Sequence, residues 1–303
     1  MNIYLNREPK SGPWGGGNRV VVELSKEIVK NNWGLTFELT PDVDVIFCFD
    51  PRPNNLGIWY QDFLNHKNSY NSRIIQRIGD LGTHGKPELT NLVRQTMSLS
   101  DYLIFPSQWA KQHIGFEGQN CKVVNNRPAP IFHENKRNNT VLDKKIQLVT
   151  HHWSTNPKKG FSIYKKIDDF LDQQQGYEFT YIGRLPQDLK FRNIKHIPPM
   201  DAVELAKKLP EYDIYVSASI EEAGANHVLE AMACGLPVVY HDDGGSIVNY
   251  CEKYGEGFSS FSQLMAKIKK VIENYDLYKR KILSYEETIK QTSLEYVDII
   301  CSK

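Results

Sequence analysis

The 303-residue sequence predicts an α/β protein made of two Rossmann-like domains. The length exceeds the usual size of one hydrophobic core. Short apolar runs alternate with helical patterns, and a polar stretch at 133–143 interrupts this alternation near the middle of the chain. We therefore expect an N-terminal domain over 1–135, a second domain over 144–275 and a C-terminal helix over 276–303, with the polar stretch as the interdomain linker.

The first half of the chain alternates predicted strands and helices. Val20, Val21, Leu24 and Ile28 have the spacing of one apolar helix face. We expect helices at 18–29, at 89–99 and from Ser107 onward, and strands at 3–5, 43–49, 73–78, 102–105 and 121–124. Alternation of this kind predicts a parallel sheet covered by helices.

The second half repeats the pattern after the polar stretch. Predicted strands fall at 147–150, 178–182, 213–219 and 237–240, and predicted helices at 160–173, 202–208, 263–274 and 276–300, with a further helix after Asn226. A strand followed by a tight loop, a helix and a second strand is the unit that parallel sheets are built from. The second domain is therefore expected to carry its own parallel sheet.

Composition narrows the class of function. The formal net charge is +1, which gives no bulk attraction to nucleic acid and leaves peripheral contact with a membrane open. The five cysteines lack zinc-ligand spacing, and their odd number argues against a disulfide framework. No apolar run is long enough to cross a bilayer, and the N-terminus lacks the apolar core of a signal peptide. We expect a cytoplasmic protein.

The most informative segment runs from Glu221 to Val239. It places the carboxylates of Glu222 and Glu230 eight residues apart, one in a loop and the other in the first turns of a helix. Carboxylate oxygens only accept hydrogen bonds, so paired sugar hydroxyls are natural partners for them. Because helical side chains lean toward the N-terminus of their helix, Glu230 is expected to point back toward the loop and Glu222.

The helix after this loop offers a phosphate site. Asn226 is the expected N-cap residue and His227 begins the first turn. The first N–H groups of a helix have no acceptor inside it and attract anions. Gly224 and Ala225 add little bulk, so a ligand can approach this backbone closely. Hydroxyl acceptors on both sides of a phosphate site suit a nucleotide sugar.

The same residues carry a family resemblance. The segment resembles the E-x7-E signature of retaining glycosyltransferases of the GT-B fold, family 4, usually written E-G-F-G-x-x-x-x-E-A-M-A-x-G-x-P-V-V. In register are Glu222, Gly224, Glu230, Ala231, Met232, Ala233, Gly235, Pro237, Val238 and Val239, whereas Ala223 and Ala225 depart from the pattern. The resemblance implies that two Rossmann-like domains face a central cleft and that the last helix crosses back to the first domain. It also implies that Glu222 contacts the donor sugar and Glu230 the ribose.

Further donor-binding residues follow from the same resemblance. Lys159 matches the lysine of a basic pair that family members place before a glycine, and the arginine of that pair is missing here. Physically, a lysine at this point neutralises a departing diphosphate. Arg184, next to Gly183, falls where relatives approach the base or the phosphates. The alternative for both side chains is a solvated loop residue.

Candidate residues in the first domain lie after predicted strands. Gly15, Gly16 and Gly17 open the first helix and let backbone N–H groups approach a phosphate or sugar, unless they form only a surface turn. Asp80 and His84 follow another strand. Ligands of parallel sheets bind outside the carboxyl ends of the strands, so this pair is a candidate to act on the acceptor hydroxyl.

These residues predict a hexosyltransferase that moves a sugar from a nucleotide-diphosphate donor to an acceptor hydroxyl on a glycan, glycolipid or small molecule, with retention. The donor is a substrate, and no cofactor or metal is expected because helix dipole and lysine oppose the diphosphate charge. The first domain is expected to bind the acceptor and the second the donor. The alternatives are a sugar-nucleotide epimerase or phosphorylase of the same fold, and a non-catalytic sugar- or nucleotide-binding protein.

Overall fold

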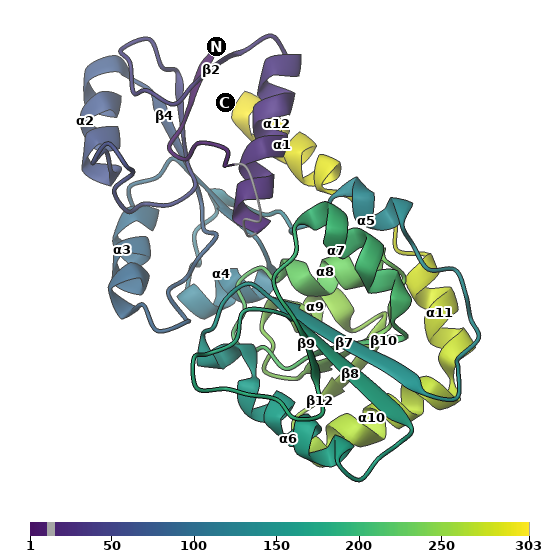
Figure 1. The fold of residues 1–303 in the computed structure, drawn as a ribbon. Helices are drawn as coiled ribbons and strands as arrows, with labels where there is room; N and C mark the ends of the chain where they lie inside the picture. Colours follow the sequence, from purple (N-terminus) through teal and green to yellow (C-terminus); the bar gives the residue numbers. More distant parts are fainter. Residues whose placement is uncertain (11–15, 303) are drawn as a thin grey trace. The chain divides into compact units, whose positions relative to one another are not determined.

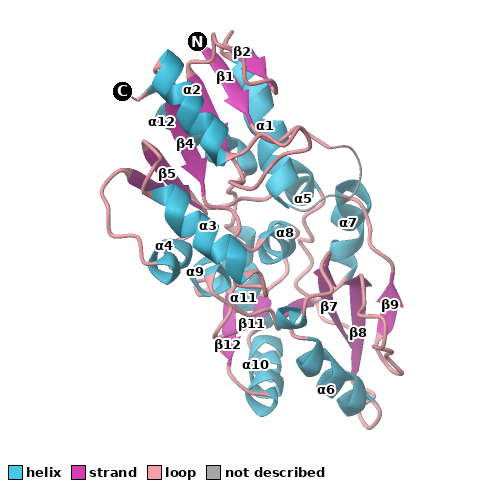
Figure 2. Ribbon diagram, turned by 90° about the vertical axis from the view of Figure 1, so that its left-hand side faces the viewer, coloured by secondary structure: helices cyan, strands magenta, loops and turns pink. Residues whose placement is uncertain are grey.

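The computed structural model of the chain describes residues 1–10 and 16–302 (Figure 1). They divide into two compact units. The first comprises Met1–Asn126 and Ile289–Lys303, and the second Arg127–Thr288. Each unit holds a six-stranded sheet in which every strand pair is parallel, surrounded by helices (Figure 2). The predicted α/β class with two Rossmann-like units is confirmed.

The first sheet has the order β2-β1-β3-β4-β5-β6. Its strands are β1 (Asn2–Leu5), β2 (Gly34–Thr36), β3 (Val45–Cys48), β4 (Arg73–Arg77), β5 (Tyr102–Phe105) and β6 (Cys121–Val123). The helices of this unit are α1 (Gly16–Lys30), α2 (Tyr60–Tyr70), α3 (Pro87–Met97), α4 (Gln108–Ile114) and α12 (Ile289–Cys301).

Alternate side chains along these strands pack into two separate cores, one on each face of the sheet. Ile3 and Leu5 of β1 point into a cluster with α1 and α12, whereas Tyr4 between them packs with Phe63 of α2 on the other face. Successive side chains of a strand point to opposite faces, so an entirely apolar strand is what a sheet covered on both sides requires.

The second sheet has the order β12-β11-β10-β7-β8-β9. Its strands are β7 (Ile146–His152), β8 (Tyr177–Gly183), β9 (Lys195–Ile197), β10 (Ile214–Ser217), β11 (Val238–His241) and β12 (Gly255–Phe258). The helices of this unit are α5 (Pro130–Glu134), α6 (Phe161–Leu171), α7 (Ala202–Lys208), α8 (Asn226–Ala233), α9 (Ser246–Cys251), α10 (Phe261–Glu273) and α11 (Tyr275–Leu283), with single 3₁₀ turns η1 (Pro157–Lys159) and η2 (Leu209–Glu211).

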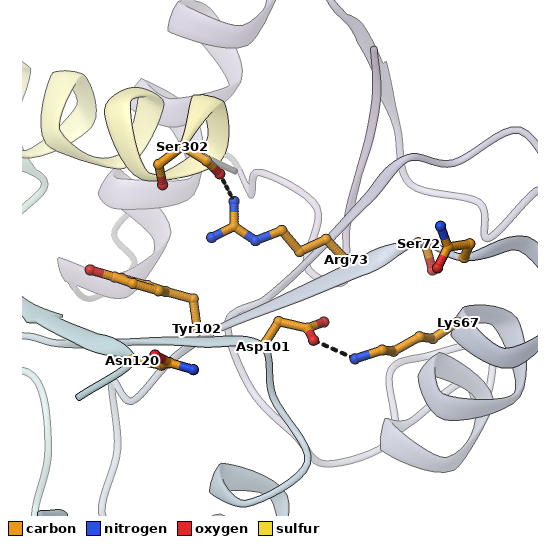
Figure 3. A pocket seen from close by; sticks show the side chains of 8 residues that line it. Lys67, Ser72, Arg73, Asp101, Tyr102, Asn120 and Ser302 are labelled. Carbon is orange, nitrogen blue, oxygen red and sulfur yellow. Dashed lines mark hydrogen bonds and ion pairs between the residues drawn. The ribbon is translucent and has the colours of Figure 1, made fainter. Parts of the chain in front are cut away.

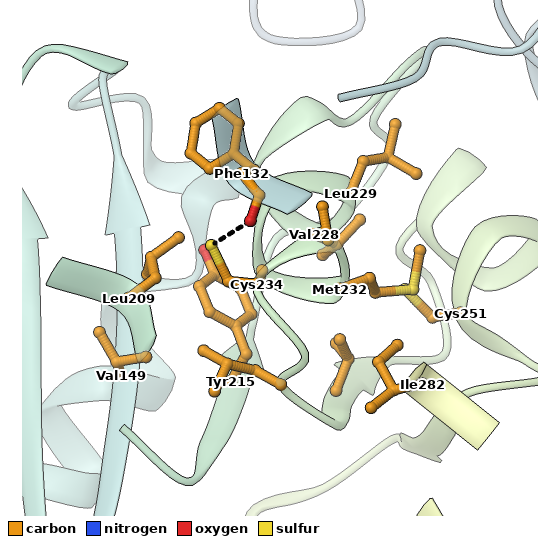
Figure 4. Close-up of a cluster of buried hydrophobic side chains, with 14 of the residues drawn as sticks. Phe132, Val149, Leu209, Tyr215, Val228, Leu229, Met232, Cys234, Cys251 and Ile282 are labelled. Atoms are coloured by element: carbon orange, nitrogen blue, oxygen red, sulfur yellow. Dashed lines mark hydrogen bonds between the residues drawn. The ribbon is translucent and has the colours of Figure 1, made fainter. Parts of the chain in front are cut away.

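Helix α8 lies at the centre of one core of this unit. Val228, Leu229 and Met232 are buried against Val149 and Tyr215 of the sheet (Figure 4). The thiol of Cys234, just past the helix, donates to the carbonyl of Phe132 at 3.5 Å. The helix that carries the sequence motif is therefore fixed to the sheet along its length.

The stretch expected to be a linker belongs to the second unit. Residues 130–134 form α5, and the Arg137 guanidinium pairs with the carboxylate of Asp213 at 2.8 Å. Asp213 is 2% exposed, so the basic residue that suggested a polar linker instead neutralises a buried carboxylate.

The C-terminal segment also differs from its prediction. One helix was expected over 276–300, but the structure has α11 and α12 with residues 284–288 between them. Helix α12 packs against α1, as Figure 1 shows, and the Arg77 Nε donates to the hydroxyl of Tyr296 at 2.9 Å. In residues 1–10 and 16–302, no helix is long and apolar enough to span a membrane.

Candidate active site

The predicted donor-binding residues of the second unit all follow the carboxyl ends of neighbouring strands. Strands β7, β8, β10 and β11 are parallel, so their carboxyl ends meet at one edge of the sheet. Lys159 follows β7, Arg184 follows β8, and Glu222 and the start of α8 follow β10. The topology therefore brings these three segments to the same edge.

The loop carrying Glu222 is held by the loop after β11. The amide of Glu222 donates to the Gly244 carbonyl at 3.3 Å, and the amide of Ser246 donates to the Glu222 carbonyl at 2.8 Å. The hydroxyl of the buried Ser246 also accepts from the Ala225 amide at 3.0 Å. Hydrogen bonds on both sides of Glu222 fix its backbone before any ligand binds.

Two consecutive lysines pair with two consecutive carboxylates at this edge. Lys159 and Glu222 form an ion pair of 2.5 Å whose side chains are 13% and 12% exposed. The neighbouring pair, Lys158 and Glu221, is 33% and 37% exposed. The two charges of an ion pair shielded from water attract each other more strongly than those of an exposed pair. Removing one partner of a shielded pair also costs more free energy, because the other charge is left buried and unpaired. The inner pair thus places a cation and an acceptor side by side in a low-dielectric site.

A glycine fixes the lysine loop against β10. Gly160 has a φ of +86°, and a Cβ added there would lie 2.3 Å from the carbonyl oxygen of Ala218. The amide of Ile220 donates to the Lys158 carbonyl at 2.9 Å. Only glycine combines that backbone angle with this close approach, which explains why a glycine follows Lys159 in the sequence.

Helix α8 begins one residue earlier than predicted. Its N-cap is Ala225, which has no side-chain capping bond, and Asn226 is already helical, with its side-chain Nδ2 donating to the Gly224 carbonyl at 3.4 Å. The prediction of Asn226 as the N-cap is wrong because Ser246 supplies the hydroxyl that anchors this loop. The amides of the first turn still lack acceptors within the helix.

Glu230 is buried rather than open to solvent. It is 3% exposed, and its Oε2 lies 3.0 Å from Nε2 of His151, the penultimate residue of β7. Both Glu222 and Glu230 act electrostatically on His227 in the first turn of α8. The imidazole of His227 therefore lies in the electrostatic field of both carboxylates.

His227 is held neutral by its surroundings. Burial lowers the pKa of His227 to about 3, and its Nε2 lies 2.9 Å from the hydroxyl of Ser217 at the end of β10. Its ring is in edge contact with that of His152, with the centroids 4.9 Å apart. An uncharged imidazole adds a hydrogen-bonding group to the site without adding charge.

This pKa predicts a pH-dependent stability. Between pH 6.5 and 3 the unfolded chain protonates this imidazole and the folded chain does not, so the free energy of unfolding falls as the pH falls. We expect His227 to account for a loss of up to about 2 kcal/mol from pH 7 to pH 5. Urea unfolding of the wild type and of His227→Gln at both pH values checks this. Equal pH dependence in the two proteins would contradict it.

Arg184 lies on an aromatic side chain at the end of β8. Its guanidinium carbon is 3.9 Å from the ring centroid of Trp153, which follows β7. Gly183 before it has a φ of +138°, and a Cβ there would lie 2.0 Å from the His152 carbonyl oxygen. The stack gives the exposed Arg184 a defined direction that no local sequence pattern indicated.

The candidate residues of the first unit have a different setting. Asp80 accepts from the Gly82 amide at 2.9 Å and pairs with Lys86 at 2.8 Å, and its side chain is 40% exposed. His84 is half-buried in the same loop after β4. Gly16 and Gly17 are the first residues of α1, and a Cβ at Gly17 would meet nothing within 4 Å. Gly15 lies outside the described residues.

A separate cavity lies at the opposite edge of the first sheet, where β4 and β5 begin (Figure 3). Its volume is about 410 Å³. Both of its cations have partners: Lys67 pairs with Asp101, and Arg73 donates to the carbonyls of Ile299 and Ser302. The hydrogen bonds of Arg73 therefore anchor the end of α12 to β4. Across residues 1–10 and 16–302, no group of three histidine, cysteine, aspartate or glutamate side chains is placed to hold a metal ion.

Comparison with known proteins bears on the second unit first. Residues 146–274 match the family model of group 1 glycosyl transferases. The matched segment includes Lys159, Arg184, Glu222 and Glu230, so the predicted donor residues all lie within the part of the chain that is similar to this family. No curated protein sequence matches the chain.

Solved structures extend the likeness to the whole chain. WaaG, described as a glycosyltransferase involved in lipopolysaccharide biosynthesis, is 14% identical, with all of both chains covered and a TM-score of 0.66. Anabaena Alr3699/HepE is 13% identical over 99% of both chains, with a TM-score of 0.65. TarM is 14% identical with a TM-score of 0.63, and the match covers 94% of this chain and 59% of TarM.

The fold is GT-B. Both units of this GT-B protein have the parallel α/β architecture that the motif resemblance implied. At these identities the solved structures show the fold alone.

Sequence reasoning did not find two of the contacts at the site. The link from His151 to Glu230 and the stack of Arg184 on Trp153 each join segments far apart in the chain. One signal was present: β7 ends in two consecutive histidines, His151 and His152. Imidazoles at the carboxyl end of a parallel strand point to the ligand edge of the sheet.

Proposed function

We propose that this protein is a retaining glycosyltransferase that moves a hexose from a nucleotide-diphosphate donor to an acceptor hydroxyl. The observation that carries the proposal is the shielded pair of Lys159 and Glu222 beside the start of α8, inside the segment that matches group 1 glycosyl transferases. It combines a cation and free helix amides for a diphosphate with a carboxylate for sugar hydroxyls.

Each donor residue has a separate task in this proposal. Lys159 and the first amides of α8 stabilise the diphosphate as the bond from its oxygen to the anomeric carbon breaks. Glu222 orients the sugar while the acceptor oxygen forms the new bond on the same face. Glu230 accepts from the ribose hydroxyls, and Arg184 approaches the phosphates.

The first unit is proposed to present the acceptor. Asp80 and His84 follow β4, and in this proposal one of them takes the proton of the acceptor hydroxyl. Gly16 and Gly17 offer backbone amides at the start of α1. The acceptor in this proposal is a glycan, a glycolipid or a small molecule. The proposal is compatible with a cytoplasmic location and with peripheral membrane contact.

The charge arrangement supports catalysis without a metal. A diphosphate gains one lysine cation and the partial positive charge of a helix N-terminus. Among the solved structures, Alr3699/HepE is described as a complex with UDP and glucose, which are the two components of a UDP-linked hexose.

A panel of UDP-, GDP- and ADP-linked sugars tests the proposal. We expect one of them to raise the melting temperature of the protein in the presence of a chelator, and acceptor-dependent release of its nucleoside diphosphate to follow. Stabilisation without any turnover would favour a binding protein, and interconversion of the donor without an acceptor would favour an epimerase. If no nucleotide sugar stabilises the protein, the donor site is wrongly assigned.

A further inference from the structure

His151 lies at the end of β7 and contacts the carboxylate assigned to the ribose. Its Nε2 is 3.0 Å from Oε2 of Glu230, and the two side chains are 10% and 4% exposed. Its Nδ1 is 3.1 Å from the hydroxyl of Tyr215, a fully buried residue of β10. The imidazole therefore bridges two strands of the sheet and helix α8.

The Glu230 carboxylate fixes which nitrogen of His151 donates. A carboxylate only accepts hydrogen bonds, so Nε2 carries the proton that it donates to Oε2. The Tyr215 hydroxyl accepts from the His151 amide at 3.0 Å and lies 3.2 Å from the His151 carbonyl, so it holds the opposite side of the ring.

A buried carboxylate needs such a donor. Glu230 sits on a helix packed into the core, where a carboxylate without a partner is costly. Holding Oε2 on the imidazole sets the rotation of the carboxyl group and so the direction of its other oxygen. A hydrogen bond to a ligand depends on that direction.

We propose that His151 is a positioning residue that aims Glu230 at the ribose hydroxyls and thereby selects ribonucleotides over 2′-deoxyribonucleotides. This rests on the proposed function, because it needs a nucleotide donor in the second unit. Selection follows because a buried acceptor left without its hydroxyl partner costs more than a solvated one. Tyr215 supports the same selection by fixing the imidazole.

The test compares two amide replacements that differ in reach. Glutamine places its side-chain nitrogen near the position of Nε2, and asparagine near that of Nδ1. Binding of UDP, GDP and ADP and of their 2′-deoxy forms is measured by titration calorimetry, using the nucleotide that binds the wild type best. We expect about a 10-fold preference for the ribonucleotide in the wild type and in His151→Gln, and about 2-fold or less in His151→Asn.

A double-mutant comparison separates positioning from a structural effect. Glu230→Gln is expected to abolish the preference, and adding His151→Asn to it is expected to change nothing further. His133→Ala removes another imidazole of the second unit, whose Nε2 lies 2.8 Å from the Glu287 carbonyl, and should keep the preference. Each variant is first checked for an unchanged circular dichroism spectrum.

The outcomes distinguish the two proposals. A full preference in His151→Asn, with nucleotide binding intact, would overturn the role of His151 and leave the glycosyltransferase proposal standing. A further change in the preference for the ribonucleotide when His151→Asn is added to Glu230→Gln would also overturn the role of His151. If none of the nucleotides binds the wild type, both proposals fail.

Discussion

Replacing Lys159 with alanine is expected to lower kcat for sugar transfer by about 10²- to 10³-fold. Its side chain is 13% exposed, and its ammonium group is already paired with a carboxylate at the ligand edge of the second sheet. A charge placed in advance in a shielded site stabilises a developing negative charge without reorganisation of water. The effect should therefore appear in kcat as well as in donor binding.

Lys158 provides the matched control for this substitution. It is the preceding residue and also pairs with a glutamate, but its side chain is 33% exposed. Solvent screens that pair, so Lys158→Ala should change kcat by about 3-fold or less. Steady-state rates of nucleoside diphosphate release measure both variants. Equal losses in the two would mean that the inner lysine has no special role in the reaction.

Glu222→Gln is expected to lower kcat/KM by about 100-fold while leaving the affinity for the free nucleoside diphosphate unchanged or higher. The carboxylate is assigned to the sugar, so removing its charge weakens an interaction that only the complete donor makes. The same charge engages Lys159 in the ligand-free protein. Without the charge of Glu222, Lys159 is available to the diphosphate. The affinity for the free nucleoside diphosphate is therefore expected to stay the same or to rise.

Glu221→Gln is the control for this second substitution. Glu221 adjoins Glu222 and pairs with Lys158, and its side chain is 37% exposed. Transfer rates and calorimetric affinities should stay close to those of the wild type. Weaker nucleotide binding in Glu222→Gln would contradict the assignment of Glu222 to the sugar, since it would place this carboxylate on the diphosphate or ribose side.

Much of the second unit was predictable because its signals are local. The apolar runs at 147–150 and 178–182 became β7 and β8, each extended by one or more residues. Gly235 and Pro237 correctly marked the end of α8 and the approach to β11. Parallel pairing follows from the strand–helix–strand order, which requires a crossover.

Weak local signals account for the elements that were not predicted. Helix α2 (Tyr60–Tyr70) is largely polar, with Tyr60, Phe63 and His66 as its buried side chains. Strands β2, β9 and β12 are only three or four residues long. Each lies at the edge of its sheet, where little apolar surface is needed. Neighbouring strands and backbone pairing, rather than composition, define such elements.

The sequence by itself determined the α/β class, the parallel sheets and the Glu222–Glu230 spacing, because periodicity and helix geometry act within a few residues. Only the tertiary structure decided the partners of these carboxylates. Lys159 is 63 residues from Glu222, and His151 is 79 residues from Glu230. Sheet order and close packing bring such groups together, and neither is written in any short stretch of chain.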